Sequence, residues 1–290
     1  MKTIKYFFQF LIIFFLFLIF KIFGLKISSN LSSFLFKIFG PFFRPKKRIE
    51  KNILKAFPEI KTKELKTIIN NMWGNYGRIL SEYVFLKDFR KSKFQNNIKI
   101  IGQDVLEEIK KNNKPVVFIS GHFNNFELMA MHIEKSGINL AAIYRPLNNI
   151  FLNPFMVYLR KKYICKNQIK KGLGGTREIV NFVKQNNSIA LMVDQRVGES
   201  ERYPFFNIPA HTTTIPAQLA LKFNLNIVPI YLERRQDNTF FMEVSQPIEV
   251  NKTKNLDEDK KKITIQINKV IEKMLLKNPT QWIWTHNRWK

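Results

Sequence analysis

His122 and Glu127 are the two side chains of this sequence whose types and spacing best suit group-transfer chemistry. They lie in the segment GHFNNFE (residues 121–127), directly after an apolar run. Acyl transfer to an alcohol needs a base, because a hydroxyl is a weak nucleophile at neutral pH, and a neutral imidazole can take that proton. A carboxylate that holds the other ring nitrogen fixes the tautomer of such a base. We therefore interpret His122 as a general base and Glu127 as its orienting partner. A surface ion pair is the alternative for this spacing taken alone.

Three further charged residues lie near the ends of predicted strands or on the helix that follows one of them. Arg145 comes after the apolar run at 140–144, Arg160 lies on the helix predicted beyond it, and Asp194 ends the run at 188–193. The carboxyl ends of strands are where α/β sheets bind ligands. An arginine at this edge can bind a phosphate or help to hold an oxyanion. Each residue alone would more often be solvated surface, but their shared edge predicts one site.

Apolar runs that read as strands alternate with helical patterns from residue 98 onward. The predicted strands cover residues 98–101, 115–120, 140–144, 188–193, 227–232 and 240–244. The predicted helices cover residues 123–135, 153–163, 176–184, 216–223 and 257–276, and residues 196–214 are expected to be irregular. This alternation predicts an α/β fold with a mixed sheet flanked by helices. We expect three parts: an anchor at 1–27, a helical membrane-proximal region at 28–95, and an α/β domain at 96–290.

The N-terminal segment predicts a membrane anchor. Residues 4–25 are mostly Phe, Leu and Ile, which is about the length that crosses a bilayer core of roughly 30 Å. No small-residue cleavage site follows, so we favour an uncleaved anchor over a signal peptide. Many more cations follow the segment than precede it, which predicts a single pass with the body of the protein in the cytoplasm. The apolar residues 31–43 are too few to span, and either an interfacial helix or a core helix fits them.

The composition of the chain indicates which classes of molecule it binds. The formal charge is +26, which suggests a polyanionic partner such as an anionic membrane, an acidic carrier protein or nucleic acid. The basic residues are spread along the chain and not gathered among aromatic ones, so we expect no nucleic acid. The single cysteine, Cys165, excludes an internal disulfide, and no Cys/His cluster has metal-ligand spacing. Trp282 and Trp284 could pack in the core or rest at the membrane interface.

In combination these motifs resemble the bacterial lipid A biosynthesis acyltransferases of the late, or secondary, lauroyl/myristoyl type. The resemblance covers essentially the whole chain. The residues that carry it, besides the N-terminal anchor, are Phe57-Pro58-Glu59, Gly121-His122-Phe123, Glu127, Tyr144-Arg145-Pro146, Asp194-Gln195, Pro204-Phe205-Phe206, Thr212 and the ending Gln281-Trp282-Ile283-Trp284, His286 and Arg288-Trp289-Lys290.

This resemblance implies a fold like that of the glycerolipid acyltransferases and an enzyme of the bacterial inner membrane. It implies transfer of an acyl chain from acyl carrier protein to a hydroxyl of a lipid A precursor at the cytoplasmic face, with no metal or nucleotide cofactor. It also implies roles for His122 as base, Glu127 as its partner, and Arg160 as a ligand of anionic groups or of the oxyanion. Asp194 is expected to hold a nearby cation.

Two departures from the family pattern leave the acceptor and the chain length open. The His motif contains Asn124-Asn125-Phe126, and the segment at 196–202 is more charged than in some members. A related acyltransferase that acts on a glycerophospholipid, an ornithine lipid or a glycolipid is one alternative. A membrane-tethered protein that only binds anionic lipid or nucleic acid is another, and it predicts that His122→Ala leaves function intact.

Overall fold

The predicted α/β fold is confirmed by a mixed sheet of seven strands. The computed structural model describes residues 2–198 and 200–290, without the side chains of Ser92, Gln95 and Asp237. In spatial order the strands are β1 (Ile98–Ile101), β9 (Phe240–Val244), β8 (Asn226–Arg234), β2 (Val116–Ser120), β5 (Ser188–Met192), β3 (Leu140–Tyr144) and β4 (Asn167–Lys170). The five strands from β8 to β4 are parallel, whereas β9 is antiparallel to β8. The carboxyl ends of the parallel strands therefore share one edge.

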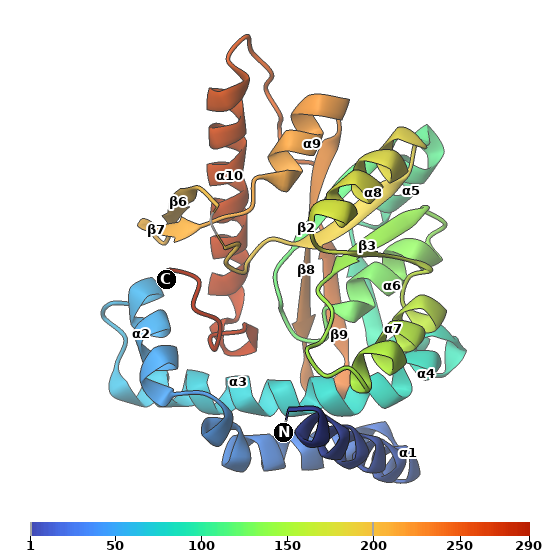
Figure 1. Cartoon of the computed structure of the whole chain (residues 1–290), viewed down its shortest axis with the longest axis vertical. Coiled ribbons are helices and arrows are strands. Elements are labelled where there is room, and N and C mark those ends of the chain that lie inside the picture. The colour runs from blue at the N-terminus through green and yellow to red at the C-terminus, as the bar shows by residue number, and fades with distance from the viewer. Residues whose placement is uncertain (1, 199) are drawn as a thin grey trace.

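Helices cover both faces of this sheet (Figure 1). One face carries α5 (Gln103–Asn112), α6 (Glu127–Lys135) and α7 (Leu152–Tyr163), and the other carries α8 (Leu173–Lys184), α9 (Ile215–Phe223) and α10 (Leu256–Lys277). Phe118 of β2 packs in the first of these cores, and its neighbours Val117 and Ile119 pack in the second, because side chains alternate along a strand. A strand buried on both faces is apolar throughout, which is why β2 was predictable.

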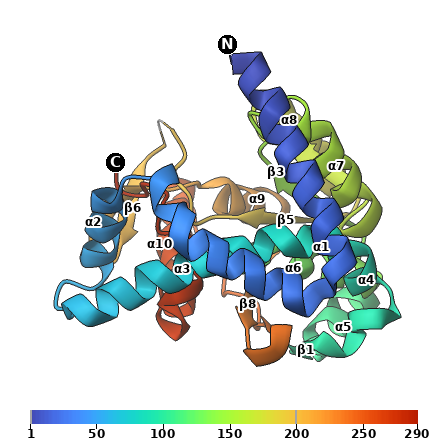
Figure 2. The ribbon, with the colours of Figure 1, turned by 90° about the horizontal axis from the view of Figure 1, so that it is seen from below.

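Four helices precede the sheet in the chain, and the first and third of them lie across its carboxyl edge (Figure 1). They are α1 (Lys2–Phe39), α2 (Lys46–Ala56), α3 (Thr62–Glu82) and α4 (Leu86–Arg90). Short 3₁₀ helices lie at Gly40–Phe43, Tyr83–Phe85, Ser92–Asn97, Gln236–Asn238 and Pro279–Gln281. In Figure 1, α3 runs beneath the end of β8, and Figure 2 shows α1 on the outer side of α3.

The first helix is long and apolar enough to cross a membrane, as predicted. It is kinked at Gly24, whose φ of 76° is readily adopted only by glycine. After the kink, residues 25–39 bury one side against α3 and expose the other, so neither a plain core helix nor a spanning segment describes them. The helix runs through the boundary expected at residue 27, and the three-part division stays a prediction.

Three details of the prediction were wrong. The edge strand β4 was missed because its sequence, NQIK, is mostly polar. Residues 196–214 are not wholly irregular, since they contain the hairpin of β6 (Arg202–Phe205) and β7 (Ile208–His211). Helix α6 begins at Glu127, four residues later than expected, because Asn124 adopts a φ of 49° that a helix does not allow.

Candidate active site

The turn that carries His122 follows β2 and is held by two buried asparagines. The amide Nδ2 of Asn124 donates to the Leu232 carbonyl at 3.1 Å, and its backbone N–H donates to the Gln281 carbonyl at 3.1 Å. Asn125 Nδ2 donates to Glu82 Oε2 at 3.1 Å. Asn124 and Asn125 thus bind the His turn to β8, to α3 and to the C-terminal segment.

Asp194, and not Glu127, orients the ring of His122. The His122 Nδ1 atom lies 2.7 Å from Asp194 Oδ1, and the His122 backbone N–H donates to Oδ2 at 2.7 Å. The register of the sheet explains this contact. Ser120 of β2 pairs with Met192 of β5, so the residues two positions beyond each of them face one another. The expectation that Glu127 holds the ring is corrected accordingly.

The environment of Asp194 keeps its carboxylate ionised. Burial alone would raise its pKa, but the charge of a protonated His122 and hydrogen bonds from His122 and Trp282 lower the pKa to about 2. The indole Nε1 of Trp282 donates to Oδ2 at 2.8 Å. A carboxylate that accepts the Nδ1 proton leaves the lone pair of His122 on Nε2. The amide nitrogen of Gln195 lies 3.4 Å from Nε2, and the His122 side chain is 20% exposed, so the imidazole is accessible from the pocket.

Glu127 belongs to a second buried cluster, with Arg160 and Tyr83. The guanidinium Nε of Arg160 donates to Glu127 Oε1 at 2.7 Å, and Nη2 lies 2.6 Å from the same oxygen. The Tyr83 hydroxyl donates to this oxygen and accepts from Arg160 Nη2 at 3.0 Å. Burial would lower the pKa of Arg160, but the charge of Glu127 raises it above its ordinary value. Glu127 therefore fixes the position of a cation and makes no hydrogen bond to the His122 ring in the described part of the chain.

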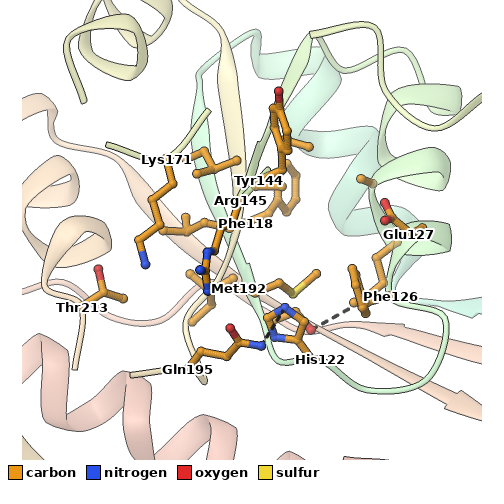
Figure 3. A pocket seen from close by; sticks show the side chains of 18 of the residues that line it. Phe118, His122, Phe126, Glu127, Tyr144, Arg145, Lys171, Met192, Gln195 and Thr213 are labelled. Carbon is orange, nitrogen blue, oxygen red and sulfur yellow. Dashed lines mark hydrogen bonds between the residues drawn. The ribbon is translucent and has the colours of Figure 1, made fainter. Parts of the chain in front are cut away.

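Both clusters border one pocket of about 260 Å³, drawn in Figure 3. Its polar side includes Arg145, Lys171 and Arg196 besides His122. Burial and the nearby charge of Arg145 lower the pKa of Lys171, so the two cations are close enough to repel each other. The structure therefore brings all five predicted site residues to this sheet edge: four line the pocket, and Asp194 lies behind the His122 ring.

The inner end of the pocket is apolar. It reaches between the sheet and α6, where Phe118, Met129, Ala130, Ile133 and Ala190 line it. The pocket therefore joins His122 and several cations to a space that suits a hydrocarbon chain. No cluster of three or more His, Cys, Asp or Glu side chains that could hold a metal ion occurs among the described residues.

Sequence reasoning missed the residues that hold the strand ends. Arg288 is fully buried and donates to the carbonyls of Val193 and Gln195, at 3.2 and 2.9 Å, on either side of Asp194. Trp282 is buried against Asp194, so it lies in the core of the protein and not at a membrane interface. The C-terminal cluster of Trp and Arg was a visible signal, but nothing in its spacing named Asp194 as its partner.

A second buried ion pair supports the same turn. Both nitrogens of the Arg234 fork bind Glu82, the last residue of α3, with Nη2 3.0 Å from Oε2. Because Glu82 also accepts from Asn125, this pair connects α3 and β8 to the His motif. Neither residue stood out in the sequence, since a Glu in a helix and an Arg after a strand are common.

The chain is similar to curated proteins of lipid A biosynthesis. The chain is 25% identical over 244 residues to lipid A biosynthesis acyltransferase 2 of Shigella flexneri, covering 83% of this chain and 76% of that protein. It is 23% identical to the lipid A biosynthesis palmitoleoyltransferase of Escherichia coli K12 (86% and 80% covered) and 23% identical to the lauroyltransferase of that bacterium (85% and 79%). The family model for bacterial lipid A biosynthesis acyltransferases matches residues 1–290. The chain therefore belongs to the bacterial lipid A biosynthesis acyltransferase family.

Proposed function

We propose that this protein transfers a fatty acyl chain from acyl carrier protein to a hydroxyl of a lipid A precursor at the cytoplasmic face of the inner membrane. The observation that carries the proposal is the His122–Asp194 pair at a pocket that has cations on one side and an apolar inner end. Family membership supports acyl transfer and a lipid A acceptor. The donor, the residues and the membrane face are our inference.

In the proposed reaction, Nε2 of His122 takes the proton of the acceptor hydroxyl as its oxygen attacks the thioester carbonyl. A tetrahedral oxyanion forms, and its collapse makes the ester and breaks the carbon–sulfur bond. The imidazolium then gives the proton to the departing thiolate. Asp194 stabilises the imidazolium through Nδ1–H, as a carboxylate does in Ser-His-Asp enzymes.

Arg160 is a cation of the pocket lining whose position is fixed by hydrogen bonds. Its Nε and Nη2 are held by Glu127 and Tyr83, whereas Nη1 makes no hydrogen bond to another described residue. A fixed guanidinium at the pocket wall can stabilise an oxyanion without reorganising during the reaction. We assign this role to Arg160 and the positioning of Arg160 to Glu127.

Arg145, Lys171 and Arg196 would hold the anionic groups of the substrates. The phosphodiester of the carrier's prosthetic arm and the phosphates of a lipid A precursor both suit such a cluster. The apolar inner end would hold the acyl chain. A body with net charge +26 would also be attracted to an anionic leaflet and to the acidic carrier protein.

The test uses the purified full-length protein in detergent with long-chain acyl carrier protein and a tetra-acylated lipid A precursor. Mass spectrometry should find a penta-acylated product. His122→Ala should lower kcat/KM by roughly 10²-fold or more, because general-base catalysis is removed. Wild-type activity in this variant would overturn the mechanism.

The same assay separates the alternatives. Acylation of a glycerophospholipid, an ornithine lipid or a glycolipid, without acylation of the lipid A precursor, would replace the acceptor but keep the base. No acyl transfer to any of these acceptors would favour a protein that only binds anionic lipid. Lipid mass spectrometry of cells without the gene would identify the acceptor and the chain together.

A further inference from the structure

The second part of α1, residues 25–39, has its polar and apolar sides reversed relative to a helix on the surface of a water-soluble domain. Four small polar side chains are buried on the side that faces the protein, beside the apolar Leu25: Ser28, Ser29, Ser32 and Ser33. The outward side carries large apolar side chains that are 38–60% exposed: Ile27, Leu31, Phe34 and Ile38. In water this arrangement would be unfavourable, because large apolar side chains gain by leaving water.

The inward serines hold this segment by specific contacts. Ser32 Oγ donates to the Gly77 carbonyl of α3 at 2.7 Å, and Ser29 Oγ donates to Asn238 Oδ1 at 2.9 Å. A Cβ atom on Gly77 would lie 2.1 Å from the Ser32 carbonyl oxygen, so the two helices are in very close contact. These contacts fix the rotation of the helix about its own axis, so the apolar stripe must face outward.

The outward stripe is narrow and has a polar flank. At 100° per residue, its four apolar side chains fall within an arc of about 60°. Lys26, Asn30 and Lys37 recur along one flank of it, and Arg44 to Arg48 follow the helix with four cations in five residues. Phe42 and Phe43, 83% and 65% exposed, extend the apolar surface beyond the helix. An apolar stripe beside a row of cations is typical of helices that lie in the surface of an anionic bilayer.

We propose that residues 25–43 lie in the plane of the cytoplasmic leaflet, with Ile27, Leu31, Phe34, Ile38 and Phe42 among the acyl chains. The surface is continuous with the apolar N-terminal part of α1, which is itself long and apolar enough to enter the bilayer. Because α3 lies between this segment and the carboxyl edge of the sheet, the leaflet then faces the edge that holds His122 (Figures 1 and 2).

The test places nitroxide labels on the full-length protein in vesicles of phosphatidylethanolamine and phosphatidylglycerol. Phe34→Cys and Ile38→Cys report on the stripe. Leu256→Cys is the matched control, because it is also an exposed apolar residue, and the start of α10 lies at the far end of the molecule from α1 (Figure 1). The native Cys165 does not interfere, since it is buried and burial raises the pKa of its thiol to about 12.

Labels at positions 34 and 38 should collide often with oxygen and rarely with a water-soluble nickel chelate, and the label at 256 should do the reverse. Nickel collisions at 34 and 38 as frequent as at 256 would overturn the proposal. Labels at 34 and 38 shielded from both reagents, with spin–spin broadening that disappears on dilution with unlabelled protein, would mean that a second copy covers the stripe. None of these readings depends on acyltransferase activity, so a failure here leaves the proposed reaction untouched.

Discussion

Glu127 and Asp194 are carboxylates of the same site, and each forms a hydrogen bond with a different basic side chain. Asp194 binds the imidazole of His122, and Glu127 binds the guanidinium of Arg160. The spacing of the sequence motif suggests a single His–Glu pair, but the contacts divide the site into two units. This division predicts which residues depend on one another energetically.

Double-mutant cycles on the free energy of unfolding should reveal these two units. Glu127→Gln and Arg160→Gln should couple by about 1–3 kcal/mol, because removal of one partner leaves the other buried and unpaired. His122→Gln and Glu127→Gln share no hydrogen-bond partner and should add to within about 0.5 kcal/mol. Denaturant unfolding in detergent measures all the variants. A larger coupling for the His122–Glu127 cycle would restore the single-pair interpretation.

The lowered pKa of Asp194 predicts how the stability of the protein changes at acidic pH. Because its folded pKa is lowered from 3.8 to about 2, the carboxylate stabilises the fold fully above pH 4. That contribution, about 2 kcal/mol, is lost as the pH falls from about 4 to about 2. The stability advantage of wild type over Asp194→Asn should shrink by this amount across the window. Asp257→Asn, which removes an exposed carboxylate, is the control, and parallel curves for all three proteins would contradict the assignment.

At the scale of elements, the contact between α1 and α3 depends on glycine. Gly77→Ala should destabilise the protein by about 1–3 kcal/mol, because the new methyl group would overlap the Ser32 carbonyl. Gly174→Ala is the matched control, since this helical glycine has nothing within 4 Å of its added Cβ and alanine favours helices. Equal free energies of unfolding for the two variants would mean that α1 and α3 can move apart to accommodate the methyl group without loss of stability.

The sequence was informative about elements wherever one physical pattern dominated. Buried parallel strands such as β2 and β5 are continuous apolar runs, so both were predictable within a residue. The strand β4 was not, because an edge strand needs few apolar side chains. The hydrogen-bond partner of His122 could not be predicted either, since it depends on the register of β2 against β5. His122 and Asp194 are 72 residues apart in the sequence. Short-range spacing favours Glu127, whereas strand pairing selects Asp194.

At the scale of the whole molecule, catalysis should depend on the membrane as well as on the pocket. The double variant Ile27→Gln and Phe34→Gln should keep activity toward an acceptor in detergent micelles and lose about 10-fold or more toward the same acceptor in anionic vesicles. The physical reason is the loss of buried apolar area at the leaflet, about 1.5–3 kcal/mol for each large side chain. Assays of product formation in the two settings check this. Leu256→Gln should act like wild type in both, and an equal loss in micelles and vesicles would point to a folding defect.

The residues that secure the candidate base come late in the chain. Trp282 and Arg288 hold Asp194 and its neighbours, and Gln281 holds the turn after His122, although all the strands precede them. During translation the apolar helix α1 is made first, so the proposed anchor would reach the membrane long before residues 281–288 leave the ribosome. Until then the His122–Asp194 pair lacks its indole donor and its guanidinium support. In the proposed enzyme, a nascent chain would therefore reach the leaflet with its site unfinished, and the proposed acyl transfer would begin only after residues 281–288 have been added.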